Sequence, residues 1–359
     1  MARSKFSGTF KIIKLLLPAA ANLYAAAMVV YLALRLLFGD GFWWLSLLNT
    51  FAHLLFLPLL PLLALAALAR ARLTALRLLP LAALGGFWIG PYYLPRAEAP
   101  ASGSTIQVLT FNIWGNNRRL KTVEEWIRHS GADLVLLQEV APIYNNERLE
   151  GLKDLYPYQS VQPDQARWGG NVTLSRYPIL DEAYIDLETP EAAMPLRLLL
   201  DVDGQIVAVY NVHLAWPVAE TRLSLPVDNM YLQVALGFDD SIRNRQIAGL
   251  LRHLRAEPYP FIVGGDFNTS DQSDTYRLLA AQLNDAFRTA GRGFGGTWPV
   301  SAARGLPAFL PPLIRIDYLW HSDHFRALDA RRGPQLGSDH LPVLAMLELL
   351  PGSSVSSKM

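Results

Sequence analysis

The chain has 359 residues, 51% of them hydrophobic, and its 32 Lys and Arg nearly balance its 31 Asp and Glu, for a formal net charge of +1. This length gives room for about two or three domains, and the lack of cysteine excludes disulfides, zinc–thiolate sites and thiol nucleophiles. Residues 1–94 hold eight of the basic residues and one acid, so the remainder has a net charge of −6. That acidic remainder argues against a general nucleic-acid binder, which normally presents a positive surface.

Three long apolar runs, over 12–38, 42–69 and 78–94, account for a mean hydropathy of +0.18, which is high for a soluble protein. Each run is close to or above the roughly 20 residues that a helix needs to cross a bilayer core. A cleaved signal peptide would explain the first run but not the other two. A soluble helical bundle would need polar faces at helical spacing. We therefore expect a membrane domain over 1–94 with three transmembrane helices.

Basic residues near these runs predict the orientation of the chain. The N-terminus carries Arg3 and Lys5, and the second connection carries Arg70 and Arg72, whereas the first connection has neither Lys nor Arg. Loops rich in Lys and Arg stay in the cytoplasm. Three crossings would then place everything after residue 94 outside the cytoplasm, in a multi-pass protein of the cell membrane.

A Pro-, Ala- and Ser-rich stretch over 95–104 reads as a linker. The following segment, 105–349, is long enough for one single-core domain, and 350–359 is expected to be a disordered tail. Strand and helix patterns alternate along this domain, with a hairpin turn at Asp203-Gly204. Strands are expected at 106–111, 134–137, 172–174, 196–202, 206–212, 261–263, 316–320, 325–330 and 343–347, and helices at 121–130, 241–255 and 274–281.

One stretch suggests a functional site by itself. The apolar strand pattern 261–263 is followed by Gly264 and Gly265, and then by Asp266 and Asn268. Glycines let the backbone bend and approach another group closely. An acid and an amide that converge where a buried strand ends are typical of a site, although an ordinary Asx turn would have the same sequence.

Other predicted strands also end in, or contain, side chains that bind metals or phosphate. These are Asn112, Glu139, His213, Asp317, Asp339 and His340. Taken singly, Asn112 could cap a turn and Glu139 could be a surface charge. His213 could be a core histidine, and Asp317 could pair with Arg315. In a layered α/β fold, however, sites collect at one end of the sheet, and the joint pattern favours a single site.

The ordered motifs LTFNIW, LLQEV, GGNVTLSRYPI, YNVHL, GGDFN, RIDYLW and GSDHLPV resemble those of the endonuclease/exonuclease/phosphatase superfamily, in a membrane-anchored form of bacterial type. That superfamily includes pancreatic deoxyribonuclease, abasic-site endonucleases, neutral sphingomyelinases and inositol-phosphate 5-phosphatases. The resemblance covers about 105–349 and leaves out 1–94. It implies a four-layer α/β sandwich, in which two mixed sheets lie face to face between outer helices.

The resemblance also implies a metal-dependent phosphoric ester hydrolase that uses Mg²⁺, with Mn²⁺ as the alternative ion. A phosphodiester repels nucleophiles, so its cleavage needs a cation and hydrogen-bond donors on the phosphoryl oxygens. Mg²⁺ prefers a few carboxylates together with water and substrate oxygens. By similarity, Glu139 is the first metal ligand, Asn112 lies beside it, and Asp339 is a further ligand.

The remaining roles are also implied by similarity. Asp266 would orient or deprotonate the attacking water, and Asn268 would hold a phosphate oxygen. His340 would lie against the phosphate, with Asp317 on its other ring nitrogen to favour the imidazolium. His213 would be the second histidine, which binds phosphate or protonates the leaving oxygen.

Two apolar stretches, 217–240 and 298–314, flank these motifs and bear on the substrate. On a membrane-tethered domain they suggest contact with lipid, although they could equally pack on each other as lids. The leading hypothesis is a phosphodiesterase or phosphatase that acts on an extracytoplasmic phosphoester, with phospholipid or sphingolipid headgroups among the candidates. The alternatives are an extracytoplasmic nuclease acting on DNA or RNA and, third, a binding module without enzymatic activity.

Overall fold

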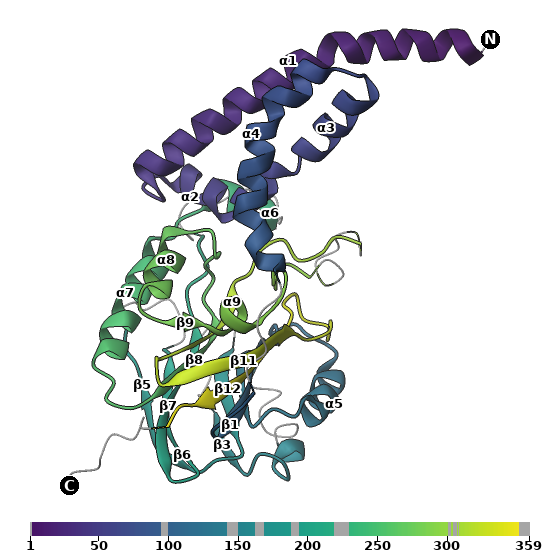
Figure 1. Ribbon diagram of the computed structural model, residues 1–359. Helices are drawn as coiled ribbons and strands as arrows, with labels where there is room; N and C mark the ends of the chain where they lie inside the picture. Colours follow the sequence, from purple (N-terminus) through teal and green to yellow (C-terminus); the bar gives the residue numbers. More distant parts are fainter. Residues whose placement is uncertain are drawn as a thin grey trace. The chain divides into compact units, whose positions relative to one another are not determined.

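The computed structural model describes residues 2–94, 100–141, 150–161, 169–187, 194–218, 230–300, 303, 307 and 309–351. The chain divides into two compact units (Figure 1). The first comprises Met1–Leu94 with Gln272–Asp274, and the second comprises Pro95–Asp271 with Thr275–Met359. Some of the predicted segments lie partly outside the described residues. These are half of the expected linker (95–99), most of the expected tail (352–359) and parts of the two apolar stretches (219–229, and 301–308 except 303 and 307).

Helices make up the first unit: α1 (Ala2–Phe38), α2 (Trp43–Thr50), η1 (Ala52–Phe56), α3 (Leu59–Leu68), α4 (Arg72–Ile89) and η2 (Gly90–Tyr93). Within the described residues, Leu15–Phe38 and Arg72–Tyr93 are long and apolar enough to cross a membrane. The middle run is a pair of helical segments, Trp43–Thr50 and Ala52–Leu68, bent by 71°. The expected three spans are therefore two, or three if the bent pair is one span.

The long helices of this unit pack through small and apolar side chains and leave others exposed. Ala21 and Met28 of α1 pack with Leu78 of α4 in one buried cluster. Leu36 and Phe87, in contrast, are 87% and 80% exposed. Apolar side chains on the outside of a group of helices are typical of helices that lie in a lipid bilayer, because there the side chains contact lipid tails and not water.

Two six-stranded mixed sheets form the centre of the second unit. Sheet A has the order β11-β12-β1-β2-β4-β3, and sheet B has the order β5-β6-β7-β8-β10-β9. The strands of sheet A are β1 (Thr105–Asn112), β2 (Leu134–Val140), β3 (Tyr158–Val161), β4 (Gly170–Ser175), β11 (Phe325–Arg332) and β12 (Val343–Leu349). Those of sheet B are β5 (Ile179–Tyr184), β6 (Leu196–Val202), β7 (Gln205–His213), β8 (Phe261–Asp266), β9 (Asn284–Asp285) and β10 (Asp317–His321).

Helices cover the outer faces of the sheets. Helix α5 (Leu120–Ser130) packs on sheet A, while α7 (Ser241–Arg255) and α8 (Asp274–Ala280) pack on sheet B, so the sheets lie between them (Figure 1). The short helices α6 (Met230–Gly237) and α9 (Ala286–Ala290) lie in connections. This is the predicted four-layer sandwich.

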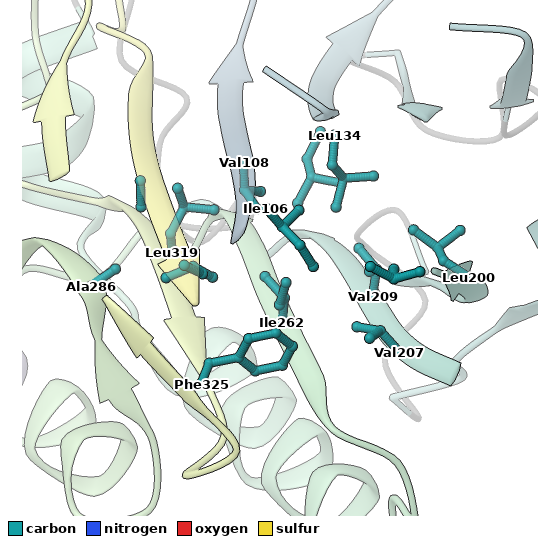
Figure 2. Packing of buried hydrophobic residues seen from close by; sticks show 14 of the residues in the cluster. Ile106, Val108, Leu134, Leu200, Val207, Val209, Ile262, Ala286, Leu319 and Phe325 are labelled. Carbon is teal, nitrogen blue, oxygen red and sulfur yellow. The ribbon is translucent and has the colours of Figure 1, made fainter. Parts of the chain in front are cut away.

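The core lies between the two sheets because each central strand is apolar on both faces. In β1, Ile106 and Val108 point toward sheet B, where Figure 2 shows them near Ile262 of β8. Leu109 and Phe111 point the other way, toward α5. Successive side chains of a strand face opposite sides, so a strand that is covered on both sides reads as a continuous apolar run.

Most predicted elements occur close to their expected positions. Helix α7 has the expected bounds, and α5 ends at Gly131, which has a φ of 75° as a left-handed helix cap. Strands β6 and β7 pair across a turn at Asp203-Gly204, as expected. Strand β5 was not expected, because it is an edge strand with exposed polar residues and lacks the apolar alternation of a half-buried strand.

Candidate active site

Strand β8 brings the Gly-Gly-Asp stretch to the end of sheet B. Gly265 has a φ of 150°, and a Cβ there would collide with the Val212 carbonyl oxygen of the neighbouring strand, so this position requires glycine. Strand β7 runs parallel to β8, with His213 in register with Asp266. Strand β10 runs antiparallel to β8 and begins at Asp317, which is also opposite Asp266. Three polar residues from three strands thus meet at one level.

Sheet A supplies the facing half of the site. Strands β1 and β2 run parallel, with Asn112 in register with Gln138, so both strands end at the same edge. Glu139 follows within an irregularity of the β2–β4 pairing and has a φ of 57°. Such irregularities re-aim side chains and are frequent next to active sites.

The loop before β12 is attached to the end of β1. Ser338 Oγ donates a hydrogen bond to the Asn112 carbonyl oxygen (2.7 Å) and accepts one from the His340 N–H (3.0 Å). This short turn presents Asp339 and His340 to the site, and the side chains of both are almost fully buried.

The first group of contacts surrounds Asn112. Its Nδ2 donates to Glu139 Oε1 (2.8 Å) and to Asp266 Oδ2 (3.0 Å), and thereby joins the two sheets. His213 Nε2 lies 3.8 Å from each of the same two carboxylate oxygens. The Gly115 N–H donates to Glu139 Oε2 (3.2 Å), which fixes the carboxylate from the other side.

The second group surrounds His340. Its Nδ1 lies 3.0 Å from Asp317 Oδ2, and its Nε2 lies 3.8 Å from Asp266 Oδ2 and 4.0 Å from Asp339 Oδ1. Asp339 Oδ2 accepts a hydrogen bond from the Trp298 indole N–H (3.2 Å).

Asn268 belongs to the same cluster through Asp266. Its backbone N–H donates to Asp266 Oδ1 (2.9 Å), and its side-chain Nδ2 donates to the Leu214 carbonyl oxygen (2.9 Å). The residues singled out in the sequence therefore lie together: Asn112, Glu139, His213, Asp266, Asn268, Asp317, Asp339 and His340. The expected alternative partner of Asp317 is engaged elsewhere, because Arg315 donates to both oxygens of Asp285 (3.0 and 2.6 Å).

The two histidines differ in charge. Burial lowers the pKa of His213 and outweighs the attraction of Asp266. Burial acts in the same direction on His340, but the carboxylates of Asp317, Asp266 and Asp339 outweigh it and raise the pKa of His340 to about 10. At neutral pH, His340 is an imidazolium and His213 is a neutral imidazole.

The carboxylates of the site lie in surroundings that disfavour their charged form. Burial raises the pKa of Asp266 to about 6, against the lowering effect of the charged His340. Burial also raises the pKa of Glu139, although the hydrogen bond from Asn112 opposes it. Both shifts indicate that negative charge is not fully compensated by the protein itself.

A divalent cation fits this arrangement. Within the described part of the chain, two groups of side chains place their ligand atoms within 4.8 Å of one another: Glu139, His213 and Asp266, and Asp266, Asp317 and His340. Carboxylate oxygens that carry excess charge suit a hard ion such as Mg²⁺. Of the three predicted ligands, Glu139 belongs to the first group, and Asn112 and Asp339 lie beside it.

Some residues of the site were not expected from the sequence. Gln138 and Asn211 are fully buried between the sheets, and Gln138 Nε2 donates to Asn211 Oδ1 (2.7 Å). They directly precede the site, one residue before Glu139 and two before His213. Their signal is a polar amide within an otherwise apolar strand, which needs a buried hydrogen-bond partner.

Solved structures of known proteins show the same fold. A member of the endonuclease/exonuclease/phosphatase group from Bacteroides vulgatus is 22% identical, with a TM-score of 0.52, over 68% of this chain and 99% of its own. TDP2 from Caenorhabditis elegans is 18% identical, with a TM-score of 0.51, over 68% of this chain and 74% of its own. At these identities the likeness concerns the fold.

A curated relative and a family profile match by sequence. The inositol phosphosphingolipids phospholipase C of Schizosaccharomyces pombe is 26% identical over 208 residues, which cover 51% of this chain and 46% of the relative. The chain thus spans about half the length of that relative. The profile of the Endonuclease/Exonuclease/phosphatase family matches residues 109–340, a range that includes every residue of the cluster described above. The chain therefore belongs to the Endonuclease/Exonuclease/phosphatase family.

Proposed function

We propose that this family member is a membrane-anchored, metal-dependent phosphoesterase that hydrolyses an extracytoplasmic phosphoester, with the headgroup of a phospholipid or sphingolipid as its substrate. The family consists of hydrolases that act on phosphoesters. The observation that carries the proposal is the pairing of an uncompensated carboxylate group around Glu139 and Asp266 with a positively charged His340. One part suits a cation, and the other suits an anionic phosphoryl group.

Glu139 would hold Mg²⁺, or Mn²⁺ in its place, with Asn112 beside it and Asp339 as a further ligand. When bound, the ion polarises a phosphoryl oxygen and offsets the carboxylate charge. Asn112 keeps Glu139 and Asp266 in place through its two donated hydrogen bonds (2.8 and 3.0 Å).

The other side chains act on the water and on the phosphoryl group. Asp266 orients the attacking water and accepts its proton, since its carboxylate lies between the two histidines. His340 donates a hydrogen bond from Nε2 to the phosphoryl group, and Asp317 keeps it charged from the Nδ1 side. Asn268 donates to a phosphate oxygen, and the neutral His213 binds the phosphate as a second donor. His213 would protonate the leaving oxygen only after it has taken up the proton that Asp266 accepts from the water, since its Nε2 lies 3.8 Å from Asp266 Oδ2.

Three features support a lipid substrate. The first unit contains helices that could span a membrane, and the Schizosaccharomyces pombe relative is named as a phospholipase C of inositol phosphosphingolipids. In the two apolar stretches, Leu236 and Phe309 are 52% and 82% exposed. We propose that 1–94 anchors the protein, 95–104 links the parts, 105–349 is the catalytic domain and 350–359 is a tail.

The test is release of headgroup from vesicles that contain phospholipid or inositol phosphosphingolipid, with purified full-length protein and Mg²⁺. We expect turnover that is lost in Asp266→Ala and retained in Asp329→Ala, since Asp329 is an exposed acid of β11. Absence of turnover on every such lipid would contradict the proposed substrate class.

For the orientation, a fusion reporter placed after Leu94 should report an extracytoplasmic position, and a cytoplasmic signal would contradict it.

The second candidate is a nuclease that acts on DNA or RNA outside the cytoplasm. The family name includes endonucleases and exonucleases, whereas the net charge of −6 after residue 94 disfavours tracking of a phosphate backbone. A plasmid-nicking assay at low salt separates the two functions: nicking without lipid turnover would favour the nuclease.

A further inference from the structure

Helix α7 carries two buried polar side chains on the face that packs against the core. Arg243 and Gln246 are each 2% exposed, whereas Arg245, between them in sequence, is exposed. Three residues apart on a helix, Arg243 and Gln246 lie on the same side. The other buried side chains of α7 include Ile247 and Leu250, which pack on sheet B. A buried guanidinium and a buried amide in this position need specific partners.

Arg243 has one partner in the loop that follows β8 and another directly before α7. Its Nη1 donates to the backbone carbonyl oxygen of Asn268 (2.6 Å), and its Nη2 donates to Asp240 Oδ2 (3.0 Å). Asp240 directly precedes α7 and keeps the charged group neutralised. One arm of the guanidinium is thus held by an acid while the other fixes the Asn268 peptide group.

Gln246 holds the neighbouring loop in the same manner. Its Oε1 accepts the backbone N–H of Ala215 (2.8 Å), two residues after His213. The two loops are also joined to each other, because the Leu214 N–H donates to the Asp266 carbonyl oxygen (2.9 Å) and Asn268 Nδ2 donates to the Leu214 carbonyl oxygen (2.9 Å).

The Asn268 peptide needs such support because its conformation is unfavourable. Asn268 has a φ of 49°, in the left-handed region, which is unfavourable for residues other than glycine and persists only where the surroundings enforce it. In this conformation its own N–H points at Asp266 Oδ1 (2.9 Å) and helps to set the direction of that carboxylate. A bond to a charged donor is about twice as strong as one between neutral groups, so Arg243 is well suited to enforce it.

We infer that Arg243 is a positioning residue of the reaction, which acts on Asp266 and Asn268 through the Asn268 peptide, and that Gln246 does the same for His213 through Ala215. This inference rests on the proposed phosphoesterase function. In this view, the buried polar side chains of α7 position the reacting groups but do not contact the substrate themselves.

The test compares full-length Arg243→Met, Arg243→Lys and Gln246→Met with the matched control Arg245→Met, on the phosphoester that the wild type hydrolyses. A misplacement of about 1 Å at a reacting group can lower the rate about 100-fold. We expect kcat to fall by about that factor in Arg243→Met with KM changed less than about threefold, a partial recovery in Arg243→Lys, and a smaller loss in Gln246→Met. Added guanidinium should raise the activity of Arg243→Ala.

Hydrogen exchange gives a second readout that needs no substrate. In Arg243→Met we expect faster exchange of the backbone amides in 210–216 and 264–270, with the exchange of α5 and β12 unchanged. A global loss of stability would instead speed exchange in all of these segments. Wild-type kcat in Arg243→Met, or unchanged exchange in both loops, would overturn the inference. If the wild type itself turns over no phosphoester, the proposed function fails, while the exchange experiment still decides whether Arg243 positions the loops. Should Arg243→Met not fold, Arg243→Lys and Gln246→Met decide the question in the same assays.

Discussion

Asp266 is the residue on which the two parts of the cluster converge. The same oxygen, Oδ2, lies 3.8 Å from the Nε2 atoms of both His213 and His340 and accepts a hydrogen bond from Asn112. A single carboxylate can therefore be influenced at once by the side chains that we propose to bind the cation and by those that we propose to bind the phosphate. Its protonation state should control the reaction.

The rate should consequently depend on pH through Asp266. The raised pKa of about 6 means that the carboxylate binds a proton below that pH and can no longer accept one from water. We expect kcat/KM to rise with pH through a midpoint near 6 at low Mg²⁺, and this midpoint to move to lower pH as Mg²⁺ approaches saturation, since a nearby cation favours the ionised form. Rate profiles measured at several Mg²⁺ concentrations test this. If the midpoint of the pH profile does not change with Mg²⁺ concentration, Asp266 does not lie at the cation site.

Asp317 should control the charge of His340. Its carboxylate is the main reason that the pKa of His340 is raised despite burial. In Asp317→Asn this pKa should fall, so the histidine should lose its proton as pH rises through the neutral range. We expect turnover to fall by about 100-fold or more at neutral pH, with a larger loss at pH 8 than at pH 6. Asp329→Asn, at an exposed position of β11, is the control, and an equal loss at both pH values would contradict the assignment.

At the scale of elements, a layer of buried amides joins the two sheets directly beneath the site. Asn211 of β7 in sheet B donates from Nδ2 to the carbonyl oxygens of Leu137 (3.2 Å) and Val172 (3.0 Å), both in sheet A, and accepts from Gln138. Sheets that pack only through apolar side chains can shift relative to each other more readily than sheets joined by directional bonds. The separation of Glu139 and His213 is therefore set by this layer.

Loss of the layer should be costly to stability. Asn211→Leu leaves Gln138 and two backbone carbonyl groups without this partner in the core, and each buried group that loses its hydrogen bond costs about 1–3 kcal/mol. We expect the free energy of unfolding to fall by at least about that amount for one such group. Urea unfolding followed by fluorescence measures it, with Asn116→Leu at an exposed turn position as the control. An unchanged midpoint would show that the layer does not hold the sheets together.

Much of this element arrangement follows from the sequence. Largely apolar strands such as β1 and β8, and the amphipathic helices α5 and α7, have residue patterns that local physical chemistry determines. The placement of Asp266 beside His213 could be expected only by analogy, because register is a property of paired strands and not of either strand alone. Glu139 shows a further limit, since the irregularity in β2 that re-aims it depends on the pairing with β4. The contact of Arg243 with Asn268 joins segments 25 residues apart, and no local pattern encodes it.

At the scale of the whole molecule, the two units have contrasting surfaces. Residues of the first unit expose many long apolar side chains such as Leu36 and Phe87, whereas the second unit buries most of its apolar residues in three clusters between and outside the sheets. The first unit would aggregate in water, and the second has its own core and hydrogen-bonded sheets.

Truncation should therefore separate the solution behaviour of the two units. We expect the full chain to remain in the membrane pellet after alkaline carbonate washing, and a variant that starts at residue 100 to stay in the supernatant. The start at 100 matters because Ser102 and Gly103 donate backbone hydrogen bonds to the buried Glu348 (2.7 Å from Gly103), so a start at 105 should give a less stable protein. Ultracentrifugation and thermal melting test both parts. Full-length protein in the carbonate supernatant would contradict a membrane anchor.

Among the described residues, three other than glycine adopt left-handed backbone conformations at or next to the candidate site: Trp114, Glu139 and Asn268, with φ values of 62°, 57° and 49°. Each conformation costs about 1–2 kcal/mol that a glycine would not incur. Glycine at these positions should make the fold sturdier, but at Glu139 and Asn268 it would also remove a side chain to which we assign a part in the proposed reaction. Durability and turnover would then compete for the same few backbone angles.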